Sequence, residues 1–126
     1  MKKKLLSLGL AVALSVVGAN AALAANQSYD VIVDSGNDYD YTQSVVGQGK
    51  YGRITLVADD IAGAFIWQKC QGDIGYNPTN IQVGTDPSHQ LDTDNVYMSY
   101  GCSYKLEVRT YSYGADYAKG YIRNWD

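Results

Sequence analysis

Polar and apolar side chains alternate along much of this chain with a period of two. The longest unbroken alternation covers residues 103–110. Such a pattern is typical of a strand that turns one face toward a core and the other toward solvent. The apolar positions are Tyr104, Leu106 and Val108, and the charged positions are Lys105, Glu107 and Arg109.

Further strands are predicted on the same grounds. Residues 51–58 place Ile54 and Leu56 on one face, and residues 62–70 contain the most apolar run, Ala-Phe-Ile-Trp at 64–67, which predicts a central strand. Shorter candidates are residues 29–33, 41–46, 80–83, 95–100 and 117–125.

Turn-forming residues separate nearly all of these segments. Clusters rich in Gly, Asn, Asp and Pro fall at 35–38, 47–49, 75–78, 84–87 and 114–116. About eight short strands at roughly ten-residue spacing predict an all-β fold, either a small antiparallel β-sandwich or a partly open barrel. We expect a single domain over residues 26–126.

Residues 1–25 have the three parts of a secretory signal peptide. A basic start at residues 2–4 precedes an apolar stretch at 5–17, and Ala22 and Ala24 supply the small residues of a cleavage site. The apolar stretch is shorter than the roughly 20 residues of a spanning helix. We therefore expect cleavage after Ala24 or Ala25, a secreted and extracellular mature chain, and no membrane attachment afterwards.

Charge narrows the range of partners. Without Lys2, Lys3 and Lys4, seven of the ten basic residues remain against thirteen acidic ones, which gives the mature chain a net charge of −6. The remaining Lys and Arg residues are scattered singly, whereas binding to a phosphate backbone uses clustered basic residues. Nucleic acid and anionic membrane surfaces are therefore not expected partners.

The two cysteines, Cys70 and Cys102, both lie in the exported part, where an oxidising environment favours a disulfide. They fall at the ends of two predicted strands, so a bridge between them could tie two sheets together. The alternatives are two free buried thiols, or a zinc site with His89, which would lack a fourth ligand without a carboxylate. The order of Trp67 and Cys70 does not match an immunoglobulin domain.

No catalytic or cofactor signature stands out. His89, the only histidine, lies in a polar loop without a paired nucleophile, and the acid pairs Asp59–Asp60 and Asp92–Asp94 fall mostly in predicted turns. We expect no enzymatic activity, no cofactor and no metal. The weak candidates for calcium are Asp34, Asp38 and Asp40, which concentrate oxygen ligands in one loop without matching the EF-hand pattern.

The aromatic residues form the most informative group, because all twelve tyrosines, both tryptophans and the only phenylalanine follow the signal. Rigid amphipathic rings suit contact surfaces, where they stack on sugars or pack against proteins. The alternative is that tyrosines simply cover the faces of strands, which favour them. The predicted contact surface consists of Tyr111, Tyr113, Tyr117, Tyr121 and Trp125, the last three at spacings of four.

Two segments carry a resemblance, Gly-Tyr-Asn-Pro-Thr-Asn-Ile-Gln-Val-Gly at 75–84 and Gly-Tyr-Ile-Arg-Asn-Trp at 120–125. Together with the signal, they resemble small secreted, tyrosine-rich all-β proteins of Gram-positive bacteria. The resemblance implies export and an all-β fold, and no activity or site residues.

These observations predict a secreted, non-enzymatic binding module that acts at the cell surface, on a cell-wall glycan or on a secreted or surface protein. The alternative is a secreted antagonist, either bacteriocin-like or an inhibitor of a foreign enzyme. An enzyme that uses His89 and the paired aspartates is the third hypothesis.

Overall fold

The computed structural model describes residues 25–126, and within them the chain is all-β. The predicted signal peptide lies outside the described residues except for Ala25. The nine strands are β1 (Ser28–Val33), β2 (Tyr39–Tyr41), β3 (Val45–Val46), β4 (Lys50–Ala58), β5 (Ala62–Cys70), β6 (Asn77–Thr85), β7 (Leu91–Met98), β8 (Cys102–Thr110) and β9 (Ala118–Arg123).

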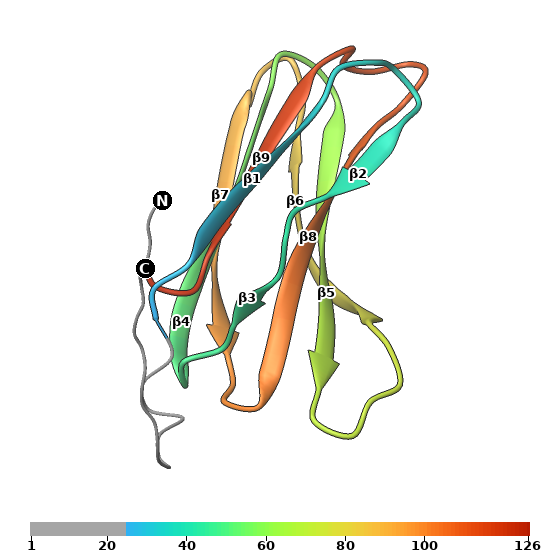
Figure 1. Cartoon of the computed structure of the whole chain (residues 1–126). Coiled ribbons are helices and arrows are strands. Elements are labelled where there is room, and N and C mark those ends of the chain that lie inside the picture. Colours follow the sequence, from blue (N-terminus) through green and yellow to red (C-terminus); the bar gives the residue numbers. More distant parts are fainter. Residues whose placement is uncertain (1–24) are drawn as a thin grey trace, which may run out of the picture.

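The strands form two antiparallel sheets that face each other (Figure 1). Sheet A has the order β1-β9-β4-β7, and sheet B has the order β2-β8-β5-β6, with the short β3 also beside β8. The predicted β-sandwich is thereby confirmed, and two separate sheets form in place of the barrel alternative. The expected central strand is also confirmed, because β5 lies between β8 and β6.

Some strand bounds differ from the prediction. The expected strand 41–46 is divided into β2 and β3, because Thr42 leaves the regular ladder and bonds β8 through both its amide and its hydroxyl. The strand expected at 80–83 is longer, and it includes Pro78. A proline is tolerated there because β6 is the edge strand of sheet B.

The core between the sheets is aliphatic, and several of its positions carry very small residues. Gly120 of β9 is an instance, since an added Cβ would lie 2.3 Å from Cγ2 of Val108 and 3.0 Å from Cδ2 of Leu106. Because Gly120 has no side chain, the two sheets can approach each other closely at this position. The largest fully buried apolar side chains are Ile54, Leu56, Ile66, Met98, Leu106, Ile122, Val45 and Val108.

A buried amide fastens the chain ends to the sandwich. Asn124 is fully buried, its Oδ1 accepts a hydrogen bond from the Gln27 amide at 2.8 Å, and its Nδ2 donates to the carbonyls of Ala25 and Val46. All its polar atoms are thus partnered, as a buried amide requires. This residue therefore joins three segments that are distant in sequence.

Cys70 and Cys102 form the predicted disulfide. The expectation that it could tie the two sheets together is wrong, because the two residues lie directly opposite each other on β5 and β8 of the same sheet. The bridge closes a chain segment that contains β6 and β7. Its effect is therefore to constrain that segment in the unfolded chain.

Replacing Gly120 with alanine is expected to lower the free energy of unfolding by about 1–3 kcal/mol, because the new methyl group overlaps Val108 across the sandwich. Urea denaturation measures the change. The matched control is Gly84→Ala on β6, where an added Cβ meets only the Ala62 carbonyl oxygen at 3.5 Å. Equal destabilisation by both variants would contradict the close approach at Gly120.

Removing the disulfide by the double substitution Cys70→Ser and Cys102→Ser is expected to cost about 3–4 kcal/mol, from the loop entropy regained by the unfolded chain. The measurement is chemical denaturation of the oxidised protein and of the variant. A loss below about 1 kcal/mol would show that the bridge does not constrain the unfolded ensemble.

Candidate functional site

The aromatic residues lie almost entirely outside the core. Tyr104 is the one aromatic side chain among the buried residues, and even its hydroxyl accepts a hydrogen bond from the Ser99 amide at 2.9 Å. Several other tyrosines are about half exposed, including Tyr39 at 50% and Tyr97 at 51%. Apart from Tyr104 and the partly buried Tyr29, which packs against the core, the rings therefore belong to the two outer faces and their adjoining loops.

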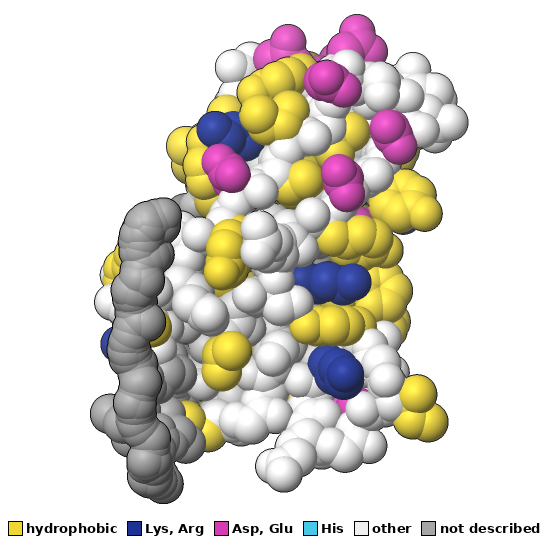
Figure 2. Space-filling view, in the orientation of Figure 1, with side chains coloured by type: hydrophobic (Ala, Val, Ile, Leu, Met, Phe, Trp, Pro, Cys, Tyr) yellow, Lys and Arg dark blue, Asp and Glu magenta, His cyan; other side chains and the backbone are white. Residues whose placement is uncertain are grey.

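The densest group covers the outer face of sheet B. In Figure 2, Lys and Arg side chains lie among hydrophobic side chains on the right of the molecule, in the region where Figure 1 places β5 and β8. We call this group the sheet B platform. It consists of Tyr39, Tyr41, Phe65, Trp67, Tyr76, Lys105, Glu107 and Arg109, on β2, β5, β8 and the loop before β6.

A buried carboxylate holds the centre of the platform. Glu107 points away from the core, as the alternation predicts, yet its side chain is only 5% exposed. Its Oε1 accepts a hydrogen bond from Nε1 of Trp67 at 2.9 Å, and its Oε2 accepts one from Nε of Arg109 at 2.8 Å. Both oxygens are thus engaged, and the indole and the guanidinium are fixed in orientation.

Cations and rings alternate around this carboxylate. Nζ of Lys105 lies 4.2 Å from the ring centroid of Tyr41 and 4.6 Å from that of Tyr76. Cζ of Arg109 lies 4.7 Å from the ring centroid of Tyr39. Such cation–π contacts contribute about 0.5–1 kcal/mol each at exposed sites, so together they reduce the mobility of the rings.

Two pKa shifts follow from this packing. Burial, followed by the charge of Glu107, raises the pKa of Tyr41, so its phenol remains neutral beyond its ordinary range. The hydrogen bond to Glu107 raises the pKa of Arg109. At neutral pH the phenol of Tyr41 is therefore neutral and lies beside the ion pair of Glu107 and Arg109.

Two hollows adjoin on this face, and Phe65 lines both. The smaller, of about 260 Å³, lies against Trp67, Glu107 and Arg109. The larger, of about 530 Å³, is lined by the ring of Tyr111, among others. Polar and aromatic groups border this larger hollow together, and they include Gln82, Asp92, Tyr111 and Tyr113.

An irregularity in β6 shapes the smaller hollow. The pairing register between β5 and β6 shifts between Phe65 and Trp67, which leaves extra residues on β6. The hydroxyl of Thr79 stabilises this irregular segment of β6, because it donates a hydrogen bond to the Ile66 carbonyl and accepts one from the Ile81 amide. Such bulges alter the direction of neighbouring side chains.

The predicted contact surface is divided between the two faces. Tyr111 and Tyr113 stack on each other with centroids 5.4 Å apart and line the larger hollow beside sheet B. Tyr121 lies on the outer face of sheet A, where it lines a different hollow, and Tyr117 borders a third one next to Val57. Trp125 follows β9 and lies under the guanidinium of Arg123.

The candidate calcium ligands serve as local hydrogen-bond acceptors. Asp38 accepts from the Ser35 hydroxyl and from the Tyr39 amide, and Asp40 accepts from the Tyr41 amide. Acidic side chains gather at the upper end of the molecule in Figure 2. Within residues 25–126, however, neither Asp34, Asp38 and Asp40 nor any other three potential ligands come together as a metal site.

His89 occupies an exposed turn. Its Nδ1 lies 3.4 Å from Oδ1 of Asp86, and its side chain is 79% exposed. Hydrogen bonds from the amides of Ser88 and His89 lower the pKa of Asp86. The pair is thus part of a turn between β6 and β7.

Most residues of the sheet B platform were not predicted from the sequence as a contact surface. Residues 64–67 were interpreted as a single apolar run, whereas Ala64 and Ile66 enter the core and Phe65 and Trp67 lie outside it. Because Phe65 and Trp67 are two residues apart, the sequence did indicate that both lie on the same face of the strand. That Glu107 lies opposite Phe65 depends on the pairing of β5 with β8, which the sequence does not specify.

Replacing Arg109 with alanine is expected to lower the free energy of unfolding by about 2–3 kcal/mol, because it leaves the Glu107 carboxylate buried without its charged partner. The fluorescence of Trp67 should change at the same time, since the indole shares that carboxylate. Denaturation followed by fluorescence measures both effects.

The control for this substitution is Lys69→Ala, on the exposed edge of the same outer face, which should change stability by less than about 0.5 kcal/mol. In the double variant Arg109→Ala with Glu107→Gln, part of the loss should be recovered, because the unpaired charge is gone. Additive effects of the two substitutions would contradict the coupling.

Comparison with protein families, curated proteins and solved structures found no match to this chain. Within residues 25–126, no helix has the length and apolar character that a membrane crossing requires. The proposed function is therefore based on the geometry of the described residues.

Proposed function

We propose that this protein is a secreted, non-enzymatic glycan-binding module, and that the sheet B platform with its two hollows is the binding face. The observation that carries the proposal is the position of Phe65, Trp67, Tyr111 and Tyr113 around two adjoining hollows that also expose polar groups. Rings that stack on sugar faces, next to groups that bond sugar hydroxyls, are the combination a glycan needs.

The rigidity of the platform supports the same proposal. Trp67 is held by Glu107, and Tyr41 is held edge-on against Trp67 with centroids 6.1 Å apart. A surface whose rings are already ordered loses little conformational entropy when a ligand binds. This matters for glycans, because their contacts are individually weak.

The chemistry of Glu107 favours binding over catalysis. Its two oxygens bond Trp67 and Arg109, and the side chain is almost completely covered. A carboxylate with this arrangement supports neighbouring rings and is poorly placed to transfer a proton to a substrate in the hollows. The disulfide is consistent with an extracellular protein, since such bridges persist in oxidising compartments.

Retention on purified peptidoglycan and on common insoluble polysaccharides tests this proposal. Trp67→Ala and Tyr113→Ala should each weaken retention about three- to tenfold, the effect of losing one stacking ring. The control is Tyr97→Ala, which removes a half-exposed ring from the opposite face and should leave retention unchanged.

If no polymer retains the wild-type protein, the glycan proposal is wrong, and a protein target becomes the leading hypothesis. If Tyr97→Ala weakens retention as much as Trp67→Ala does, the binding face has been wrongly assigned. Unfolding midpoints measured for all three variants separate a loss of binding from a loss of fold.

A further inference from the structure

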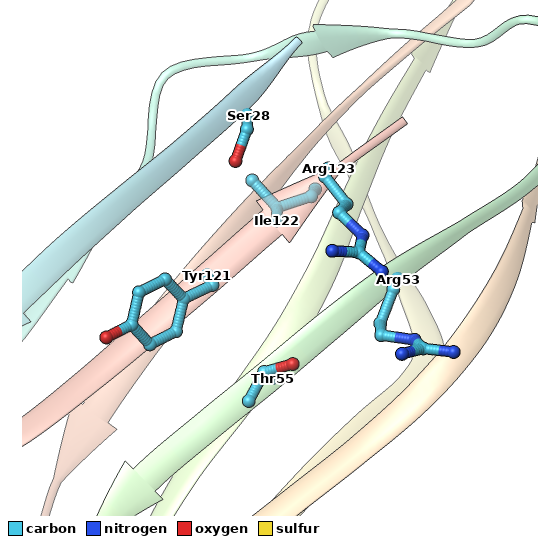
Figure 3. Close-up of a pocket in the computed structure, with 6 residues that line it drawn as sticks. All are labelled: Ser28, Arg53, Thr55, Tyr121, Ile122 and Arg123. Carbon is cyan, nitrogen blue, oxygen red and sulfur yellow. The ribbon is translucent and has the colours of Figure 1, made fainter. Parts of the chain in front are cut away.

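Two arginines lie directly opposite each other on the outer face of sheet A, away from the sheet B platform. Arg53 of β4 pairs in register with Arg123 of β9, and Ser28 of β1 is the next residue in the same row. Figure 3 shows the Arg123 side chain reaching toward β4, with its guanidinium beside the start of the Arg53 side chain. Like charges directly opposite each other destabilise a sheet, so this pair calls for an explanation.

No carboxylate side chain compensates the pair. Among residues 25–126, the three ion pairs involve other cations, and the acid of this face, Asp30, pairs with Lys119 at 3.4 Å. Arg53 and Arg123 are both only half-buried, and neither lies within ion-pair distance of an Asp or Glu side chain. Their positive charges thus add on one side of an acidic protein.

Uncharged groups and main-chain oxygens hold the two guanidinium groups in place. Nε of Arg53 donates to Oδ1 of Asn95 at 3.0 Å. Nε of Arg123 donates to the main-chain oxygen of Trp125 at 3.0 Å, and its Nη2 contacts that of Asp126 at 3.3 Å. The Asp126 oxygen is the nearest competitor for Arg123. Among the described residues, the terminal nitrogens of Arg53 and the Nη1 of Arg123 make no such bond, so they can bind an anion.

A hollow of about 170 Å³ lies beside the two arginines. Ser28, which lies opposite Arg123, adds a hydroxyl to the two cations. The Thr55 hydroxyl instead donates to Thr93, and the Tyr121 hydroxyl points away from the arginines in Figure 3. It is smaller than a site for a drug-sized molecule, which spans about 300–1,000 Å³. The lining residues are Ser28, Arg53, Thr55, Tyr121, Ile122 and Arg123.

We propose that this hollow binds a phosphate group, with Arg53 and Arg123 as the charged ligands and the hydroxyl of Ser28 as a further donor. Arginine forms bidentate hydrogen bonds with phosphate, which fixes both position and orientation. Two guanidinium groups and a hydroxyl offer more donors than the two oxygens of a carboxylate can use. A tetrahedral oxyanion matches that donor set better. This site is independent of the glycan proposal, because it lies on the opposite sheet.

The first experiment titrates inorganic phosphate into the mature protein and follows amide and arginine Nε–H signals by NMR, with sodium chloride at equal ionic strength as the reference. Shifts confined to Arg53, Arg123, Thr55 and Tyr121 support the proposal. No shift beyond the chloride reference would overturn it.

Variants at the two arginines sharpen the test. Arg53→Gln and Arg123→Gln should each weaken phosphate binding by about tenfold or more, while Lys69→Gln on sheet B should bind as the wild type does. Arg53→Gln should also leave the unfolding midpoint unchanged or raise it, because it removes a like-charge pair. Phosphate should raise the wild-type midpoint and not that of the variant. Binding that persists in both arginine variants would overturn the proposal.

Two further arms identify the source of the phosphate. Glycerol phosphate represents a soluble ester, and vesicles of phosphatidylglycerol, compared with phosphatidylcholine vesicles, represent a lipid headgroup. Arginine-dependent binding of either one identifies that source and supports the proposal. Binding of inorganic phosphate alone assigns the site to the free anion. If the protein binds none of these three ligands, the proposed phosphate site is wrong.

Discussion

The close approach of the two sheets is the constraint on which the rest of this structure depends. At Gly120 the space normally taken by a side chain is occupied by Val108 and Leu106 of the opposite sheet. Alanines at Ala64 and Ala118 keep other inward positions equally small. An interior of this thickness accommodates aliphatic side chains and has little room for rings. A chain rich in tyrosine therefore carries most of its aromatic residues on its outer faces, and Tyr104 is the buried exception.

The two outer faces differ in how their rings and charged groups are arranged. On sheet B, a buried carboxylate and two cations hold the rings against one another, and two hollows open beside them. On sheet A, the rings of Tyr51 and Tyr97 pair with each other, and within residues 25–126 Arg53 and Arg123 form no ion pair with an Asp or Glu side chain. On sheet B the rings and charged groups thus contact one another, whereas on sheet A two cations have no carboxylate side chain beside them.

The alternation of side chains predicted most of the strands and, within residues 103–109, the face to which each side chain points. It assigned Leu106 and Val108 to the core and Glu107 to the outside, as observed. Alternation carries no information about which strands pair, because pairing depends on contacts between distant segments. The meeting of Trp67 with Glu107, the opposition of Arg53 to Arg123 and the position of the disulfide within one sheet all depend on that pairing. The contacts within the sheet B platform and the arginine pair were consequently not predicted, whereas Tyr111, Tyr113 and Tyr121, which line the adjoining hollows, were predicted as contact residues.

An acidic protein can offer an anion site because its charges are separated along the strands. Asp59 and Asp60 follow the end of β4, six residues or more beyond Arg53. At about 3.3 Å per residue they lie roughly 20 Å from it along the strand. This exceeds the Debye length of about 8 Å at physiological ionic strength, so solvent ions largely screen the repulsion that the acidic end exerts on an approaching anion. The local field at the hollow then depends on the two arginines and on the charges close to them, which belong to Asp30, Lys119 and Asp126, more than on the net charge. Net charge alone therefore gives a poor guide to the partners of a sandwich in which two arginines lie opposite each other on one face.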